Sequence, residues 1–458
     1  MKRMVRWLFA GLAGLILNAA PMLARSEEVP YQLTSQDQDY LRYAEKLEEA
    51  FEQQGLSYRQ EKLENRFRRS VEQMLGSRTL DSYLSVRVRL FRDSEKEAFS
   101  LGNGSIYLSF GLVAHLENEG QLHGMIAHEL AHVLLRHHFQ AYREWGDLKS
   151  VFNSKMIPGA PARSNAIYHL ALKNYPLLQE QAADQLALEL LAGAGGDRDD
   201  LVAALERLKI SDEPGGGKRE LSQLLGDRGP EIRLNFLRGS TATTLPAERD
   251  PALRDHAAYV RLTIDLRHRA ILQQIRAKRF ATARAVVKGS LEVFPDDPRC
   301  LTDLGVVTRE WAAYGLELDQ IREQAEEEGK TREEQLRKQK GWAEETVYSP
   351  KPRPEKEDPY FSIPPPRLSE AEPYFQRALA RDPNYALAYK EAGRLYELMG
   401  RDTEAAAAYG QYLKTNPAAR EKADLLRRIQ ELSRSGAADG ETKPPAPSPG
   451  LGGEERGE

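Results

Sequence analysis

Four of the nine histidines fall in one short stretch, MIAHELAHVLLRHH, which runs from Met125 to His138. Two of them, His128 and His132, are four residues apart and therefore share one face of a helix. Their imidazoles could reach one metal ion, while Glu129, about 100° around the helix, would place its carboxylate beside the ion and take a proton from water. The pattern H-E-x-x-H therefore predicts a metal-dependent hydrolase. The alternative is a buried, His-rich helix that binds no metal.

A catalytic zinc site needs a third protein ligand and an open position for water. His138 has the spacing of the third histidine of metzincins, but that arrangement uses a glycine to break the helix, and Leu135 stands there. We expect the helix to continue, which would place His138 about 15 Å along the axis from His128 at 1.5 Å per residue. His138 and His137 are therefore expected to lie outside the ligand set.

A better candidate for the third ligand lies in LLQEQAADQLALELL, 48 residues beyond His132. Glu180 and Asp184 are four residues apart and share one face of this otherwise apolar helix. Burying two carboxylates is costly unless something charged faces them, and a zinc ion with its imidazoles would do so. We expect Glu180 to bind the ion and Asp184 to orient a histidine from behind. The alternative is that both carboxylates lie on a solvated face.

The elements that must position these residues can be read on both sides of the His-rich segment. Residues 33 to 78 have helical periodicity, and SYLSVRVRLFRD and GSIYLSFGLV alternate as strands do. Further helices are expected in NYPLLQEQAADQLALELLAGAG and RDDLVAALERL. The strand in GSIYLSFGL is a candidate sheet edge for pairing with an extended substrate, and an internal strand without that role is the equal alternative.

H-E-x-x-H followed by E-x-x-x-D resembles the HtpX and CaaX-prenyl-protease type of zinc metallopeptidase. The approach EAFSLGNGSIYLSFGLVAHLENEGQLHGMIAHELAHVLLRHH looks like the strand and helix that precede the zinc helix of that family. The resemblance covers roughly residues 40 to 240. It implies a zincin-like α+β fold, one Zn²⁺ per chain, and the following roles: His128, His132 and Glu180 as ligands, Glu129 as the catalytic base, and Asp184 behind a ligand.

The chain departs from the family pattern at two places. Glu97 stands where family members usually have asparagine, and Asp227 stands at the position of a family histidine that precedes an arginine. Arg233 fits that arginine and is a candidate contact for the transition state or the substrate. The missing histidine leaves the partner of the oxyanion open.

The C-terminal half repeats one spacing of small, apolar and proline residues. Its three copies are Ala283, Val287, Ser290 and Pro295; Ala371, Phe375, Ala378 and Pro383; and Ala405, Tyr409, Tyr412 and Pro417. The last two copies are 34 residues apart, which is the period of tetratricopeptide repeats. The spacing predicts stacked helical hairpins over residues 255–435, with an insertion at about 314–367. A generic helical bundle is the alternative, and the polar tail 436–458 is expected to be disordered.

The N-terminus reads as an export signal. MKRMVR is basic, WLFAGLAGLIL is apolar, and NAAPMLARS supplies small residues, so residues 1–26 are expected to be cleaved after Ala24 or Ser26. The apolar run is short for a membrane span, although an uncleaved anchor is the alternative. Cys300 is the single cysteine, which excludes an intrachain disulfide, and a net charge of -4 gives no general argument for nucleic acid.

Together these features predict a mostly α protein: a signal peptide, a zinc metallopeptidase domain over residues 33–250, and a helical repeat domain. With the signal and the repeats, the resemblance narrows to the BepA-like periplasmic branch of the family. It implies an exported endopeptidase that acts on unfolded or misassembled envelope proteins, with outer-membrane assembly machinery as a partner of the repeats. The competing hypothesis is a non-catalytic or latent chaperone or assembly scaffold.

Overall fold

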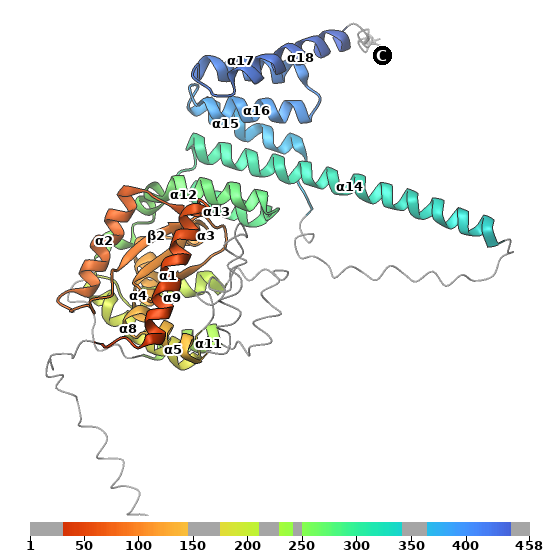
Figure 1. The fold of residues 1–458 in the computed structure, drawn as a ribbon. Helices are drawn as coiled ribbons and strands as arrows, with labels where there is room; N and C mark the ends of the chain where they lie inside the picture. The colour runs from red at the N-terminus through yellow and green to blue at the C-terminus, as the bar shows by residue number, and fades with distance from the viewer. Residues whose placement is uncertain (1–30, 145–174, 210–228, 241–249, 341–363, 441–458) are drawn as a thin grey trace, which may run out of the picture.

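The computed structural model describes residues 31–144, 175–209, 229–240, 250–340 and 364–440. It confirms a mostly helical chain with an N-terminal α+β part and a helical C-terminal part (Figure 1). The N-terminal elements are α1 (Ser35–Gln53), β1 (Ser57–Tyr58), α2 (Glu61–Leu75), β2 (Arg87–Phe91), β3 (Ala98–Ser100), β4 (Ser105–Ser109), α3 (Phe110–His115), α4 (Glu119–Leu134), α5 (His137–Glu144), α8 (Leu177–Gly193), α9 (Arg198–Lys209) and α11 (Gly229–Gly239). The C-terminal elements are η3 (Pro251–Arg254), α12 (His256–Arg276), α13 (Phe280–Val293), α14 (Pro298–Lys340), η5 (Leu368–Ala371), α15 (Glu372–Arg381), α16 (Ala386–Leu398), α17 (Asp402–Thr415) and α18 (Lys422–Gly440).

The sheet has four strands in the order β1-β2-β4-β3. β2 and β4 are parallel, and the two outer strands pair with them antiparallel. The strand predicted from GSIYLSFGL is β4, and every one of its residues is buried. It lies between β2 and β3, so its interpretation as a sheet edge is wrong. The edge on that side is the short strand β3.

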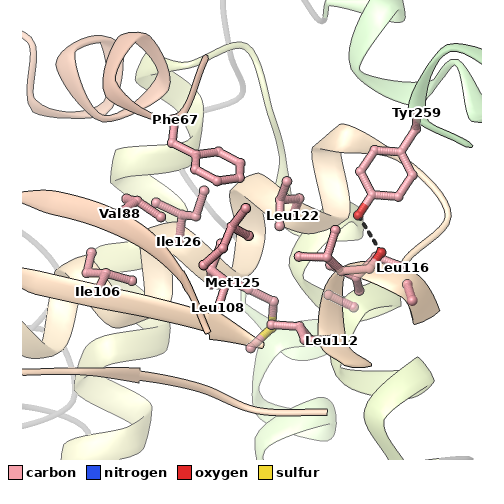
Figure 2. Packing of buried hydrophobic residues seen from close by; sticks show 14 of the residues in the cluster. Phe67, Val88, Ile106, Leu108, Leu112, Leu116, Leu122, Met125, Ile126 and Tyr259 are labelled. Atoms are coloured by element: carbon pink, nitrogen blue, oxygen red, sulfur yellow. Dashed lines mark hydrogen bonds between the residues drawn. The ribbon is translucent and has the colours of Figure 1, made fainter. Parts of the chain in front are cut away.

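Helix α4, which carries H-E-x-x-H, lies inside the core. Its N-terminus is set by Asn118, whose side-chain oxygen accepts the backbone N–H of Gln121 at 2.9 Å. Leu122, Met125 and Ile126 pack with side chains from α2, β2 and β4 (Figure 2). Fifteen of its sixteen residues are buried. His128 and His132 are therefore held on a helix that is buried in the core.

The predicted hairpins are present in the C-terminal part, where α12 pairs with α13, α14 with α15, and α16 with α17. Two glycines mark the same close approach in successive hairpins. A Cβ on Gly305 would lie 2.7 Å from the ring of Phe375, and one on Gly393 would lie 2.6 Å from the ring of Tyr409. Phe375 and Tyr409 hold equivalent places in the repeated spacing. The assignment to tetratricopeptide repeats remains a prediction.

The first hairpin is joined to the α+β part by side chains of α12. Tyr259 donates to the carbonyl oxygen of Val113, and Arg267 donates to that of Leu116, each at 2.8 Å. These carbonyls are at the C-terminal end of α3, where a helix lacks its own donors. Apolar residues of α12, α13 and α14 also belong to the main core cluster. The predicted boundary near residue 250 therefore separates two regions that share one core.

Three predictions fall partly or wholly outside the described residues. The signal peptide does so entirely. α14 continues to Lys340, well into the predicted insertion, and residues 341–363 are not described. α18 reaches Gly440, past the predicted start of the disordered tail at 436. Among the described helices, none is both long and apolar enough to cross a membrane.

Candidate metal centre

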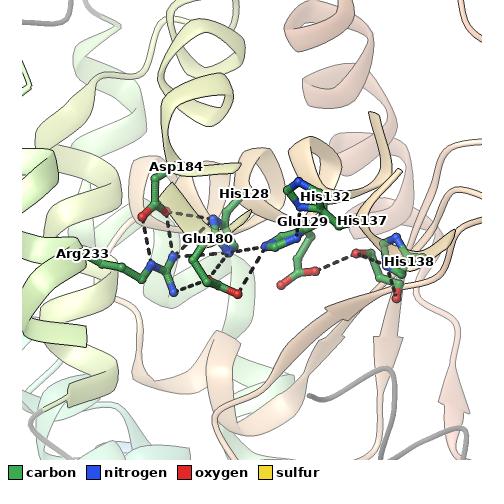
Figure 3. A network of polar contacts seen from close by, with 9 residues as sticks. His128, Glu129, His132, His137, His138, Glu180, Asp184 and Arg233 are labelled. Atoms are coloured by element: carbon green, nitrogen blue, oxygen red, sulfur yellow. Dashed lines mark hydrogen bonds and ion pairs between the residues drawn. The ribbon is translucent and has the colours of Figure 1, made fainter. Parts of the chain in front are cut away.

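The two histidines of α4 and the carboxylate of Glu180 on α8 converge on one point (Figure 3). Nε2 of His128 lies 3.1 Å from Nε2 of His132, and the Glu180 oxygens lie 3.5 and 3.7 Å from these nitrogens. Ligands about 2.1 Å from a tetrahedral zinc ion are about 3.4 Å from one another. The spacing of the three ligand atoms therefore fits a zinc site.

The outer nitrogens of both imidazoles have partners that orient the rings. Oδ1 of Asp184 lies 3.0 Å from Nδ1 of His128, and because an ionised carboxylate only accepts, Nδ1 carries the proton. Nδ1 of His132 lies 2.9 Å from Nδ1 of His137. If His132 donates in that contact and His128 has lost its second proton, both Nε2 atoms present lone pairs toward Glu180. Three acceptors then face one another, which is the donor set of a cation site.

The charges of the site suit a divalent cation. Burial would raise the pKa of Asp184, but hydrogen bonds from Arg233 and His128 lower it to about 2. Burial opposes ionisation of Glu180 as well, yet His128 and Arg233 lower its pKa. For His128, burial and Arg233 act downward, while Asp184 and Glu180 outweigh them and raise the pKa to about 9. Metal binding at His128 would therefore release a proton at neutral pH.

His132 is the neutral member of the pair. Burial, together with the nearby His128, holds its pKa well below the usual value for histidine. A neutral imidazole is the form that binds a metal. The ring of Tyr175 stacks on His132, with centroids 4.2 Å apart and planes at 23°. This contact closes one side of the site and restricts rotation of the ligand.

Glu129 lies next to the cluster of His128, His132 and Glu180 (Figure 3) and contributes no atom to it. Only 8% of the residue is exposed, and burial raises the pKa of its carboxyl group. Oε2 accepts a hydrogen bond from Oγ of Ser100, at the end of β3, over 2.8 Å. A buried carboxylate next to a candidate metal ligand has the position expected of a catalytic base.

Arg233, from α11, binds both carboxylates of α8. Its Nε and Nη2 lie 2.9 and 2.7 Å from the oxygens of Asp184, and its Nη1 lies 2.6 Å from Oε2 of Glu180. Nη2 is also 3.3 Å from Nε2 of His128. Arg233 thus lies at the site, as the sequence predicted. Its role toward a substrate remains a prediction, and Asp227 lies outside the described residues.

The prediction of an unbroken helix between His132 and His138 is wrong. α4 ends at Leu134, Arg136 adopts a left-handed conformation with φ 57°, and α5 begins at His137. Arg136 pairs with Asp81 at 2.8 Å, which helps to hold this turn without a glycine. His138 is turned toward Ser100 instead of the ligand atoms. His138 lies outside the cluster of ligand atoms, as expected. The reason is the turn at Arg136 and not a continuous helix.

Ser100 and Tyr175 also contact the site residues, and no sequence pattern pointed to either of them. Neither belongs to a motif, and each reaches the site through tertiary packing. His137 was expected only to lie outside the ligand set, and its contact with His132 follows from the turn at Arg136. The predicted ligands, base and supporting carboxylate are all brought together.

Comparison with known proteins supports a metallopeptidase, as the geometry of the site does. Residues 59–244 match the sequence model of the family described as Peptidase family M48. Residues 59–244, hereafter the M48 domain, are therefore similar to that family. The M48 domain contains H-E-x-x-H, Glu180, Asp184 and Arg233. The resemblance to a metallopeptidase of the BepA-like type is therefore confirmed for the M48 domain.

Two curated relatives show how far the similarity extends. The chain is 28% identical over 186 residues to the putative beta-barrel assembly-enhancing protease of Vibrio cholerae, which covers 38% of each chain. It is 28% identical over 177 residues to the beta-barrel assembly-enhancing protease of Escherichia coli K12, covering 35% of this chain and 36% of the relative. The chain thus spans little more than a third of either relative's length.

Proposed function

We propose that this chain is an exported zinc-dependent endopeptidase that cleaves unfolded or misassembled envelope proteins. The observation that carries the proposal is the convergence of His128, His132 and Glu180, whose ligand atoms all lie within 4.8 Å of one another, with Glu129 beside them. The M48 domain supports the same chemistry. Outer-membrane β-barrel proteins are candidate substrates because the relatives are named for β-barrel assembly.

The donor set selects the cofactor. Two imidazoles and one carboxylate are typical of catalytic zinc sites, which keep a further position open. Bound zinc would supply Lewis-acid catalysis by polarising the scissile carbonyl and lowering the pKa of water. Asp184 and His137 would orient the two imidazoles, and Arg233 would hold the carboxylates of α8 in place.

Glu129 would carry the proton through the reaction. Its carboxylate would accept a proton from the attacking water and return it to the leaving amine. Burial favours this role, since a buried carboxylate is less hydrated and its pKa is raised toward that of its proton partner. The rigid helix α4 fixes Glu129 next to the ligand His128.

Strand β3 would hold the substrate in an extended form. The carbonyl oxygen of Glu97 accepts from Ser109, and the N–H of Leu101 donates to Ser105, so these residues face β4. By the alternation of an antiparallel ladder, the backbone groups of Ala98 face away from the sheet. An unfolded chain could pair there, next to Ser100 and the base. Folded proteins lack such a free segment, which would favour unfolded substrates.

The proposed function also includes export to the periplasm and binding of a protein partner by the helical hairpins. The basic and apolar N-terminal sequence supports export to the periplasm. The stacked hairpins from α12 to α17 support recruitment of a protein partner, such as envelope assembly machinery, because stacked repeats present extended surfaces.

A latent or scaffolding function is the second candidate. It is favoured by the ion pair between Arg233 and Glu180, because this pair occupies one ligand oxygen with a competing cation. On this view the repeats bind envelope proteins and the centre does not turn over.

One experiment separates the two functions. Zinc content and casein cleavage are measured for the full chain and for Glu129→Gln, with Glu119→Gln as a control from the same helix. An endopeptidase gives one zinc per chain in all three proteins and cleavage in all but Glu129→Gln. Zinc without cleavage in the wild type favours the latent scaffold. Equal cleavage by Glu129→Gln would reject Glu129 as the base.

A further inference from the structure

The carboxylate of Glu129 is held from the side of the sheet. Oγ of Ser100 lies 2.8 Å from its Oε2, and only 1% of Ser100 is exposed. Ser100 is the last residue of β3, whereas Glu129 belongs to α4. The contact therefore links the edge strand proposed to hold the substrate to the proposed base.

His138 determines the direction of this hydrogen bond. Its Nε2 lies 2.9 Å from the carbonyl oxygen of Ser100 and 3.1 Å from Oγ of the same residue. A carbonyl oxygen can only accept, so Nε2 carries the proton of the ring. Burial lowers the pKa of His138 to about 3, which keeps the ring neutral with this single proton.

The hydroxyl of Ser100 then has one acceptor left. Because Nε2 of His138 is a donor, the hydroxyl cannot donate to it, and its proton must point to Oε2 of Glu129. The carbonyl of Ser100 thus fixes the tautomer of His138, and that tautomer fixes the hydroxyl. With the hydrogen bonds in these directions, Oε2 of Glu129 accepts from Ser100, and the second oxygen, Oε1, is left to take part in proton transfer.

We infer that Ser100, held by His138, is a positioning residue that keeps the Glu129 carboxylate in its orientation for proton transfer. The inference rests on the proposed peptidase function. It also explains how the edge strand and the base remain in register, since one residue of β3 contributes to both. His138 then acts through Ser100 and not as a ligand.

The kinetic test compares Ser100→Ala and Ser100→Thr in the full-length protein. Loss of a hydrogen bond to a charged group predicts a fall in kcat of roughly 10- to 100-fold for Ser100→Ala. KM and zinc content should stay unchanged, and Ser100→Thr should recover most of kcat because it retains the hydroxyl. A purely structural role would not give this split, so an unchanged kcat in Ser100→Ala overturns the inference.

Ser70 provides a matched control. Its Oγ lies 2.8 Å from Nε2 of His123, in a second buried Ser–His contact that joins α2 to α4. Ser70→Ala should leave kcat at the wild-type value. An equal fall in kcat for Ser70→Ala and Ser100→Ala would show a general effect of packing around α4 and would also overturn the inference.

A second measurement does not depend on activity. The shift in Tm caused by Ser100→Ala is compared in the wild type and in a Glu129→Ala background. A contact between the two residues predicts a smaller shift in the second background, and equal shifts overturn the inference. A wild type that does not cleave casein overturns the proposed function and the catalytic role of Ser100 together, whereas an active wild type with an unaffected Ser100→Ala variant overturns the inference alone.

Discussion

Nδ1 of His137 lies 2.9 Å from Nδ1 of His132. The contact forms because α4 ends at Leu134 and the chain turns at Arg136, which brings the first residue of α5 back to the side of α4. His137 is buried, and burial lowers its pKa to about 4, so it is neutral and can accept a hydrogen bond. It therefore serves His132 as Asp184 serves His128.

His137→Phe should weaken zinc binding by about 10- to 100-fold, as is usual for a lost partner of a metal-bound histidine. The ring and its packing are retained, but the acceptor for His132 is lost. Zinc affinity is measured by competition with a chromogenic chelator, with His115→Phe as a control for the loss of a buried histidine elsewhere. An affinity equal to that of the wild type would show that His132 needs no such partner.

The ligand assignment predicts opposite results for two residues near the site. Glu180→Ala should lose zinc, because only two ligands remain, while His138→Ala should keep it, because His138 faces Ser100. Metal content after dialysis decides between them. Glu189→Ala, on the same helix α8, is the control for Glu180→Ala. Equal zinc loss in Glu180→Ala and His138→Ala would contradict the assignment.

The proposed ligands could be predicted from the sequence in two pairs because the distances within each pair are local. His128 and His132 share a face by the geometry of one helix, and Glu180 and Asp184 share a face by that of another. Two carboxylates on an otherwise apolar helix were enough to suggest that this face meets the face that carries the two histidines. Single helices and strands followed from periodicity, and the hairpins from the repeated 34-residue spacing, whereas the α+β fold was implied by the resemblance to the family.

The contacts that were missed depend on tertiary structure. Ser100 reaches Glu129 only because β3 pairs with β4 and α4 packs against β3. The order of strands is also non-local, which is why β4 was taken for a possible edge. The turn at Arg136 was missed because a positive φ is uncommon without glycine, and a side-chain contact with Asp81 holds it here.

Asp184→Asn should retain the fold and weaken zinc binding by about 10- to 100-fold. Asparagine keeps the shape and one acceptor, but it loses the charge that holds Nδ1 of His128 as a donor and binds Arg233. Zinc titration and circular dichroism are the measurements. Unchanged affinity and activity would show that Asp184 does not support the ligand, despite its complete burial.

The shared core predicts that the M48 domain depends on the first hairpin. Tyr259→Phe removes the donor to the carbonyl of Val113 and should lower the free energy of unfolding by about 1–3 kcal/mol, the cost of an unsatisfied buried group. Tyr389→Phe, on α16 in a later hairpin, is the control. Urea unfolding followed by tryptophan fluorescence measures both, and equal effects would contradict a special role for Tyr259.

Truncation tests the same dependence more strongly. A chain that ends at residue 250 loses α12, and with it the donors to Val113 and Leu116 and several apolar residues of the main core. We expect it to be less stable and to lose zinc and casein cleavage. A chain that ends at residue 320 keeps α12, α13 and the core residues of α14, so it should bind zinc and cleave. Full activity in the shorter chain would show that the M48 domain folds alone and that the first hairpin serves only partner binding.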